Sequence, residues 1–174
     1  MGWMLRKKNH KVHEARGKLD LSDLTNDPVV AFSQKLDPFF QLFMCFIFPT
    51  LVSSYGWNEN VIPSYLVEGC LRNCIVLHAT FLVNSAAHIY GYRPNDKSTH
   101  ATENRLVAVI TGGEGWHNWH HAFPYDYAAS EFGAEHQYNT TKVFIDACAW
   151  VGLVTERKRA LNAWENMKLK NMKL

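Results

Sequence analysis

The chain lacks several features by which common protein classes are recognised. Its formal net charge over 174 residues is only +2, too small a positive excess to indicate a nucleic-acid partner, and we expect none. The four cysteines, which form no C-x-x-C pair, are expected to be buried thiols without disulfides. The opening residues, MGWMLRKKNHK, are charged and have no apolar stretch behind them, so no signal peptide is expected.

Charged residues are also missing from two long stretches. The mean hydropathy of −0.22 hides this segregation. Residues 38–55 contain no charged side chain, and residues 61–90 contain only Glu68 and Arg72. These two lie four positions apart, so they can pair on one helix face.

The two apolar stretches predict a transmembrane hairpin, with helices at about 38–56 and 65–90, because each reaches the roughly 20 residues that span a bilayer. Two buried helices of a soluble domain are the alternative. Lysine and arginine decide against it: seven precede residue 38, ten follow residue 90, and the connector 56–64 has none. This pattern places both basic flanks in the cytosol. We therefore expect a cytosolic segment 1–37, a hairpin 38–90 and a cytosolic helical cap 91–174.

Histidine is concentrated in the sequence HNWHH, where His117, His120 and His121 occupy five positions. On a helix, the spacings i, i+3 and i+4 fall within about 100° of arc, so the three rings share one face. The second apolar helix, at about 26 residues, would be roughly 39 Å long and would project beyond the roughly 30 Å hydrocarbon core. Asn84 and His88 lie one turn apart on this projecting end and can reach the same pocket.

This donor set predicts a metal site. Neutral imidazole binds iron, zinc, copper and nickel well. A closed structural zinc site usually includes cysteine, and none lies near the cluster, which favours iron or another transition metal.

The remaining segments carry weaker predictions. Gly112 and Gly113 should interrupt the helical structure just before the histidines, either by letting backbones pass closely or by ending one helix. Asp126 or Glu131 is a candidate to orient the ligand rings. A surface or interfacial helix near the C-terminus should turn four apolar side chains toward protein or lipid, namely Val143, Phe144, Trp150 and Val151.

Three longer sequence blocks carry a family resemblance. They are GEGWHNWHHAFPYDYAASEF (113–132), NSAAHIYGYRPND (84–96) and GKLDLSDL (17–24). Together they closely resemble the membrane-bound acyl-CoA desaturases of the stearoyl-CoA delta-9 type, and the likeness runs nearly end to end. The resemblance implies an all-α membrane protein in which four membrane helices lie under a cytosolic helical cap that holds two irons.

The resemblance also implies a set of iron ligands. His117, His120 and His121 match the third histidine box, His88 matches an additional ligand, and Asn84 matches a position that reaches iron through a water. The first two boxes of the family, HxxxxH and an earlier HxxHH, do not occur in this sequence. We therefore expect the C-terminal half of a desaturase, from a partial sequence, a truncated gene model or a splice product. With four of the nine expected histidine ligands, it should be inactive alone.

Substrate and partners follow from the same resemblance. Lys7 and Lys8 match positions that contact the CoA head, although a basic segment beside anionic lipid is the alternative. Phe81 stands where mammalian relatives have tryptophan beside the acyl tunnel. The implied reaction inserts a cis double bond into an acyl-CoA with O2 and electrons from cytochrome b5, in the endoplasmic reticulum membrane with both termini cytosolic. A membrane di-iron fatty acid hydroxylase and a non-enzymatic truncated product are the alternatives.

Overall fold

The computed structural model describes residues 5–171 and divides into two compact units, Met1–Val76 and Leu77–Leu174. Throughout the described residues the regular structure is helical, with two isolated β-bridges and no strand. The predicted all-α class is therefore confirmed. Each unit is described by itself.

The first unit carries short N-terminal helices followed by the two apolar helices. Asp27 caps one of the short helices, since its carboxylate accepts the N–H groups of Val29 and Val30. In chain order, the helices of this unit are α1 (His10–Arg16), α2 (Ser22–Thr25), α3 (Pro28–Leu36), α4 (Phe39–Leu42), η2 (Phe43–Ile47), α5 (Phe48–Gly56), α6 (Val61–Ser64), η3 (Tyr65–Leu71) and the start of α7 (Arg72–Val83).

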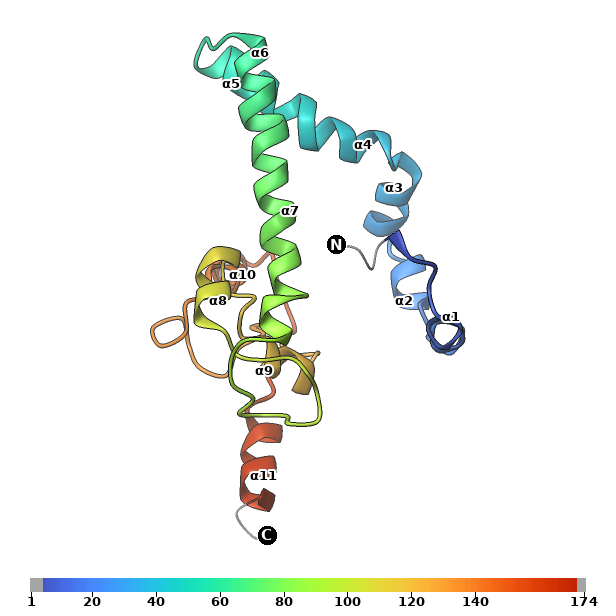
Figure 1. Cartoon of the computed structure of the whole chain (residues 1–174), viewed down its shortest axis with the longest axis vertical. Helices are drawn as coiled ribbons and strands as arrows, with labels where there is room; N and C mark the ends of the chain where they lie inside the picture. Colours follow the sequence, from blue (N-terminus) through green and yellow to red (C-terminus); the bar gives the residue numbers. More distant parts are fainter. Residues whose placement is uncertain (1–4, 172–174) are drawn as a thin grey trace. The chain divides into compact units, whose positions relative to one another are not determined.

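Two continuous helical spans are long and apolar enough to cross a membrane. They run over Phe39–Gly56 and Val61–His88, each with a mean hydropathy of 1.4. Only 11% of each apolar window is buried, so most of these side chains face outward. Figure 1 shows α5 turning back through a short loop into α6. The two long apolar helices predicted from the missing charges are therefore present, and their crossing of a membrane stays a prediction.

Both apolar spans include a π-helical stretch, η2 and η3, and these two stretches pack on each other. A side chain at Gly69 would place its Cβ 3.3 Å from the carbonyl oxygen of Phe46, so glycine allows this close approach. Arg72 crosses between the helices, with Nη2 donating to the carbonyl oxygen of Cys45 at 2.6 Å.

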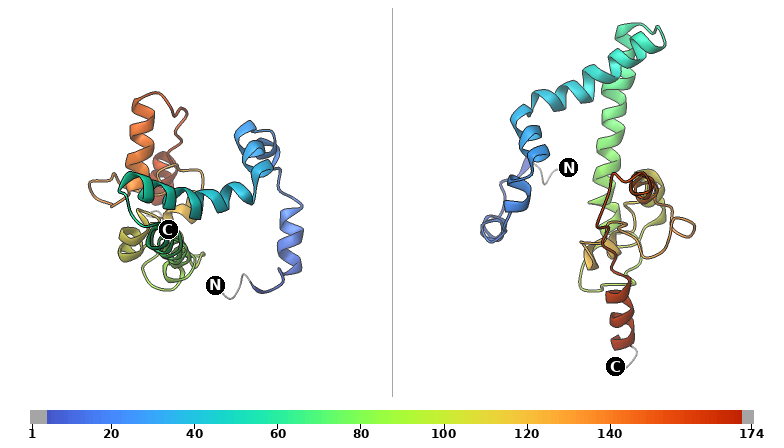
Figure 2. Two further views of the ribbon diagram at one scale, coloured as in Figure 1. Left: turned by 90° about the horizontal axis from the view of Figure 1, so that it is seen from above. Right: turned by 180° about the vertical axis from the view of Figure 1, so that it is seen from behind.

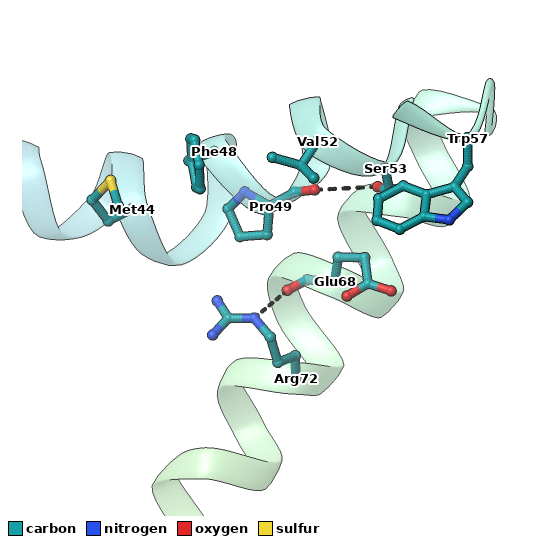
Figure 3. A pocket seen from close by; sticks show the side chains of 8 residues that line it. All are labelled: Met44, Phe48, Pro49, Val52, Ser53, Trp57, Glu68 and Arg72. Atoms are coloured by element: carbon teal, nitrogen blue, oxygen red, sulfur yellow. Dashed lines mark hydrogen bonds between the residues drawn. The ribbon is translucent and has the colours of Figure 1, made fainter. Parts of the chain in front are cut away.

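Glu68 and Arg72 do not form the ion pair that their spacing allows. Arg72 Nε donates instead to the backbone carbonyl of Glu68, at 2.7 Å. Pairing at four positions requires α-helical spacing, whereas the π-helical stretch Tyr65–Leu71 changes which side chains share a face. The two side chains instead line an apolar groove of about 610 Å³ between the helices (Figure 3).

The second unit contains short helices set among long connections (Figure 2). It begins with the end of α7, and its other helices are η4 (Ala86–His88), α8 (Arg105–Thr111), α9 (His117–Ala122), α10 (Thr140–Trp150) and α11 (Leu161–Asn171). Its core centres on Trp119 and Phe123, which pack with Ala160 and with Trp164 of α11. The indole N–H of Trp164 also donates to Asn95 Oδ1 at 3.1 Å, so the C-terminal helix is anchored to the cap.

The second apolar helix does not continue to residue 90 as an α-helix. The α-helical part ends at Val83, and a turn leads into the 3₁₀ turn Ala86–His88. Asn84 Nδ2 and Ser85 Oγ donate to carbonyl oxygens of the preceding turn, at 3.3 and 2.7 Å. Such local bonds compete with helix propagation, and periodicity alone does not reveal them. His88 therefore lies on a tighter turn than expected.

The C-terminal surface helix forms as α10, and its apolar side chains are exposed. Phe144 is 69% exposed and Trp150 is 88% exposed, and Val143 and Val151 are more than half exposed. These four side chains therefore do not face protein within the second unit. Contact with lipid stays a prediction.

Candidate metal centre

The turn that carries His88 is held in place by hydrogen bonds to the buried residue Thr102. Ala87 is fully buried, and its carbonyl oxygen accepts both the backbone N–H and the hydroxyl of Thr102, at 2.7 and 2.8 Å. The same hydroxyl lies 2.9 Å from the carbonyl oxygen of Tyr90. These bonds hold the turn that presents the His88 ring.

The HNWHH side is positioned by glycines and by a short helix. Gly112 ends α8 in the left-handed conformation, with φ of 75°, so the predicted break is confirmed. Gly115 passes so close to α8 that an added Cβ would lie 2.2 Å from the amide nitrogen of Ala108. The helix α9 begins at His117, two residues after this close contact between Gly115 and α8.

Three imidazole rings converge in the second unit. The Nε2 atoms of His88 and His117 are 3.0 Å apart, and those of His117 and His121 are 3.1 Å apart. One ligand nitrogen from each of the three lies within 4.8 Å of the others. We call His88, His117 and His121 the histidine triad. His117 is buried and His121 is exposed, so the triad lies at an edge of the unit.

The surroundings keep these rings neutral. Burial, followed by the neighbouring histidines His121, His88 and His120, lowers the pKa of His117 to about 3. Burial is also the largest cause of the lowered pKa of His121. Three neutral imidazoles with converging nitrogens form a donor set that iron and similar transition metals accept, so the residues present fit the implied metal.

Of the other two predicted ligands, only His120 has a ring contact with the triad. The His120 ring stacks on that of His117 at 5.6 Å between centroids and is 5.8 Å from that of His121, but its nitrogens fall outside the group of three. Asn84 is exposed, and its amide donates to the carbonyl oxygen of Thr80.

The predicted substrate contacts are placed as follows. Lys7 and Lys8 are exposed residues of the first unit, and Phe81 is half-buried on α7.

The expectation that Asp126 or Glu131 orients the ligand rings is wrong. The Asp126 carboxylate is buried, accepts the N–H groups of Ala128 and Ala160, and pairs with Arg159 at 3.4 Å. Glu131 pairs with Lys168 at 3.7 Å. Both carboxylates therefore bind the C-terminal segment, whose position could not be read from local sequence.

Two residues near the histidines were missed by sequence reasoning. Asn118 is fully buried, and its amide bonds four backbone groups of the loop 95–101. Glu103 is 3% exposed, and its Oε1 accepts the N–H of Trp119 at 2.8 Å. Burial is the main cause that raises the pKa of Glu103 to about 7. The only available signal was a charged residue, Glu103, just before an apolar helix.

Comparison with known proteins shows to which proteins the chain is related. No protein-family model matches the chain. It is 50% identical over 163 residues to stearoyl-CoA desaturase 2 of Rattus norvegicus, covering 94% of this chain and 45% of that protein. The chain is a homologue of the acyl-CoA desaturases.

Other relatives agree with this assignment. The desaturase homologue is 48% identical over 160 residues to stearoyl-CoA desaturase 5 of Homo sapiens, covering 92% of the chain and 48% of that protein. It is 44% identical over 171 residues to the Delta(9)-fatty-acid desaturase fat-7 of Caenorhabditis elegans, covering 98% of the chain and 50% of that protein. The desaturase homologue thus spans about half the length of the curated relatives it matches.

Proposed function

We propose that this chain is the part of a membrane acyl-CoA desaturase that carries the third histidine box and one further iron ligand. The convergence of the histidine triad carries the proposal, because the two segments that supply its rings are separated by 29 residues in sequence. Homology to the stearoyl-CoA desaturases supplies the reaction class. The substrate is then an acyl-CoA, and the product carries a new cis double bond.

The triad is proposed to bind iron through neutral ring nitrogens. His120, whose ring stacks on that of His117, and Asn84, through a water, are proposed to complete the ligands from this chain. When bound, iron supplies the activation of O2 that removal of two hydrogens from an unactivated chain requires. Burial of His117 favours this role because a protonated ring has no lone pair to donate.

The iron site needs more donors than this chain provides. Four imidazoles and one amide cannot enclose two iron ions, so the remaining ligands are proposed to come from polypeptide outside the 174 residues. We therefore expect no turnover from the 174 residues alone.

Substrate and electron partners complete the proposal. Lys7 and Lys8 are exposed and are proposed to bind the phosphates of CoA, while Phe81 would form part of the wall of the acyl tunnel. Cytochrome b5 is the proposed electron donor. The two apolar spans would anchor the chain in the lipid bilayer of the endoplasmic reticulum, with both termini in the cytosol.

A chimera tests the proposed reaction. The part of the rat stearoyl-CoA desaturase 2 that precedes its matched region is joined to this chain and expressed in a yeast strain that lacks its own delta-9 desaturase. Total fatty acids are then analysed by gas chromatography and mass spectrometry. We expect monounsaturated acids from the chimera, and none from the chain alone or from the His117→Ala chimera. A hydroxylated product would overturn desaturation in favour of a hydroxylase, and turnover by the chain alone would overturn the ligand-count argument.

A further inference from the structure

A four-residue segment, Ala101–Asn104, connects the two parts of the chain that carry the histidine triad. Ala101, Thr102 and Glu103 are 0%, 2% and 3% exposed. On the His88 side, Thr102 bonds to the carbonyl oxygens of Ala87 and Tyr90. The segment is thus attached to the turn that presents His88.

The same segment is attached by three bonds to the HNWHH helix and to Gly115, just before it. The backbone N–H of Asn104 donates to the carbonyl oxygen of Gly115 at 2.8 Å. The carbonyl oxygen of Ala101 accepts from Asn118 Nδ2 at 3.0 Å. Glu103 Oε1 accepts the N–H of Trp119 at 2.8 Å, and this is the one bond of the three made by a side chain of the segment.

The helix α9 depends on this carboxyl more than a longer helix would. It has six residues, and its N-cap residue Trp116 provides no side-chain cap. The first amides of a helix have no partner within it, and here the amide of Trp119 is buried away from water. Glu103 therefore supplies, from 16 positions earlier in the chain, the cap that the local sequence omits.

We propose that Glu103 is a positioning residue for the histidine triad: its buried carboxyl caps α9 at Trp119 and so holds His117 and His121 in register with His88. The inference rests on the proposed function for its metal. Glu103 itself contributes no ligand. Its role needs a hydrogen-bond acceptor at the distance that glutamate or glutamine reaches.

Four variants of the full chain, purified in detergent micelles, distinguish the effect of the hydrogen bond to Trp119 from the effects of negative charge and of side-chain volume at position 103. Glu103→Gln keeps an acceptor oxygen at the same reach. Glu103→Leu keeps the volume without an acceptor, and Glu103→Asp keeps the charge but shortens the reach by one methylene. Glu131→Leu is the matched control, because it removes another carboxyl whose pKa is raised by burial but which lies against Lys168. Co²⁺ alone is titrated by its visible absorption, and exchange of the Trp119 amide is followed by hydrogen–deuterium exchange.

We expect Co²⁺ affinity to fall about 10- to 100-fold in Glu103→Leu and Glu103→Asp, with at least about tenfold faster exchange at Trp119. Glu103→Gln and Glu131→Leu should stay within about threefold of the wild-type affinity. If Glu103→Leu fails to fold, the comparison of Glu103→Gln with Glu103→Asp decides.

Equal loss in Glu103→Gln and Glu103→Leu would overturn the proposal, because charge rather than the cap would then matter. Wild-type affinity in all three Glu103 variants would overturn it as well. A wild-type chain that binds no Co²⁺ would contradict the proposed metal centre instead. In that case exchange at Trp119 still tests the cap: unchanged exchange in Glu103→Leu overturns it, and faster exchange supports it.

Discussion

Replacing Asn118 by leucine should destabilise the cap more than any surface change. Asn118 is fully buried, and its Oδ1 accepts the N–H groups of Asn95 and Asp96 at 2.9 and 3.1 Å. Its Nδ2 donates to the carbonyl oxygens of Asp96 and Ala101 at 2.7 and 3.0 Å. Leucine has the same branched arrangement of side-chain heavy atoms but is larger, so it removes all four bonds without leaving space for a replacement water.

The magnitude follows from these four bonds. Each is worth about 1 kcal/mol net, and buried groups left without a partner cost somewhat more, so the free energy of unfolding should fall by about 4 kcal/mol. For a chain of this size, that loss lowers the melting temperature by roughly 8–16 °C. A typical domain has only about 5–15 kcal/mol of stability, so the variant should be marginally folded.

Thermal unfolding in detergent, followed by tryptophan fluorescence, measures this loss. Hydrogen–deuterium exchange at the amides of Asn95 and Asp96 locates it. Asn162→Leu is the control, because Asn162 is exposed on α11 and should change the melting temperature little. If Asn118→Leu melts within about 2 °C of wild type, or if both amides keep their protection, Asn118 does not hold the loop as described.

Three further predictions concern other parts of the site. Because the pKa of Glu103 is raised to about 7, its contribution to stability is full below about pH 4.5 and is lost as pH rises through 7. Between pH 4.5 and 8, the free energy of unfolding of the wild type, measured by thermal unfolding, should therefore fall by roughly 3 kcal/mol relative to that of Glu103→Gln. Parallel pH profiles of the two proteins would contradict this. Gly91→Ala should lower stability by about 1–3 kcal/mol in the same assay, since φ is +142° and the new Cβ would lie 2.3 Å from the carbonyl oxygen of Glu103; an unchanged melting temperature would mean that the backbone relaxes. In Co²⁺ titrations of this chain, His121→Ala should weaken binding at least about 100-fold and His120→Ala at most about tenfold, because only His121 belongs to the group of three. Equal losses would mean that His120 binds the same ion as the triad.

The two apolar helices could be predicted because their signal is local. A bilayer requires long runs without charge, and such runs are visible in residues 38–55 and 61–90. The π-helical stretches within them were not predictable, because they depend on how the two helices pack at Gly69. For the same reason, the sequence did not reveal that Glu68 and Arg72 form no ion pair.

The candidate metal centre was predicted as a group of histidines but not in its detail. Spacing on a helix indicated that the HNWHH rings share a face, and the rings of His117 and His121 do converge. Spacing gave no information about ring orientation, which places His120 beside the triad.

The hydrogen bonds made by Glu103 and Asp126 could not be predicted from the sequence for a different reason. Glu103 bonds to a residue 16 positions away, and the Asp126 carboxylate bonds to Ala160 at 34 positions. No periodic pattern encodes such long-range contacts, and their partners become visible only in the folded chain.

Iron K-edge X-ray absorption of the chain loaded anaerobically with Fe²⁺ tests the central claim most directly. We predict a nitrogen and oxygen first shell with the multiple scattering of about three imidazoles, and a clear loss of that scattering in His117→Ala. A first shell without imidazole, or one that the substitution leaves unchanged, would show that these rings do not hold the metal.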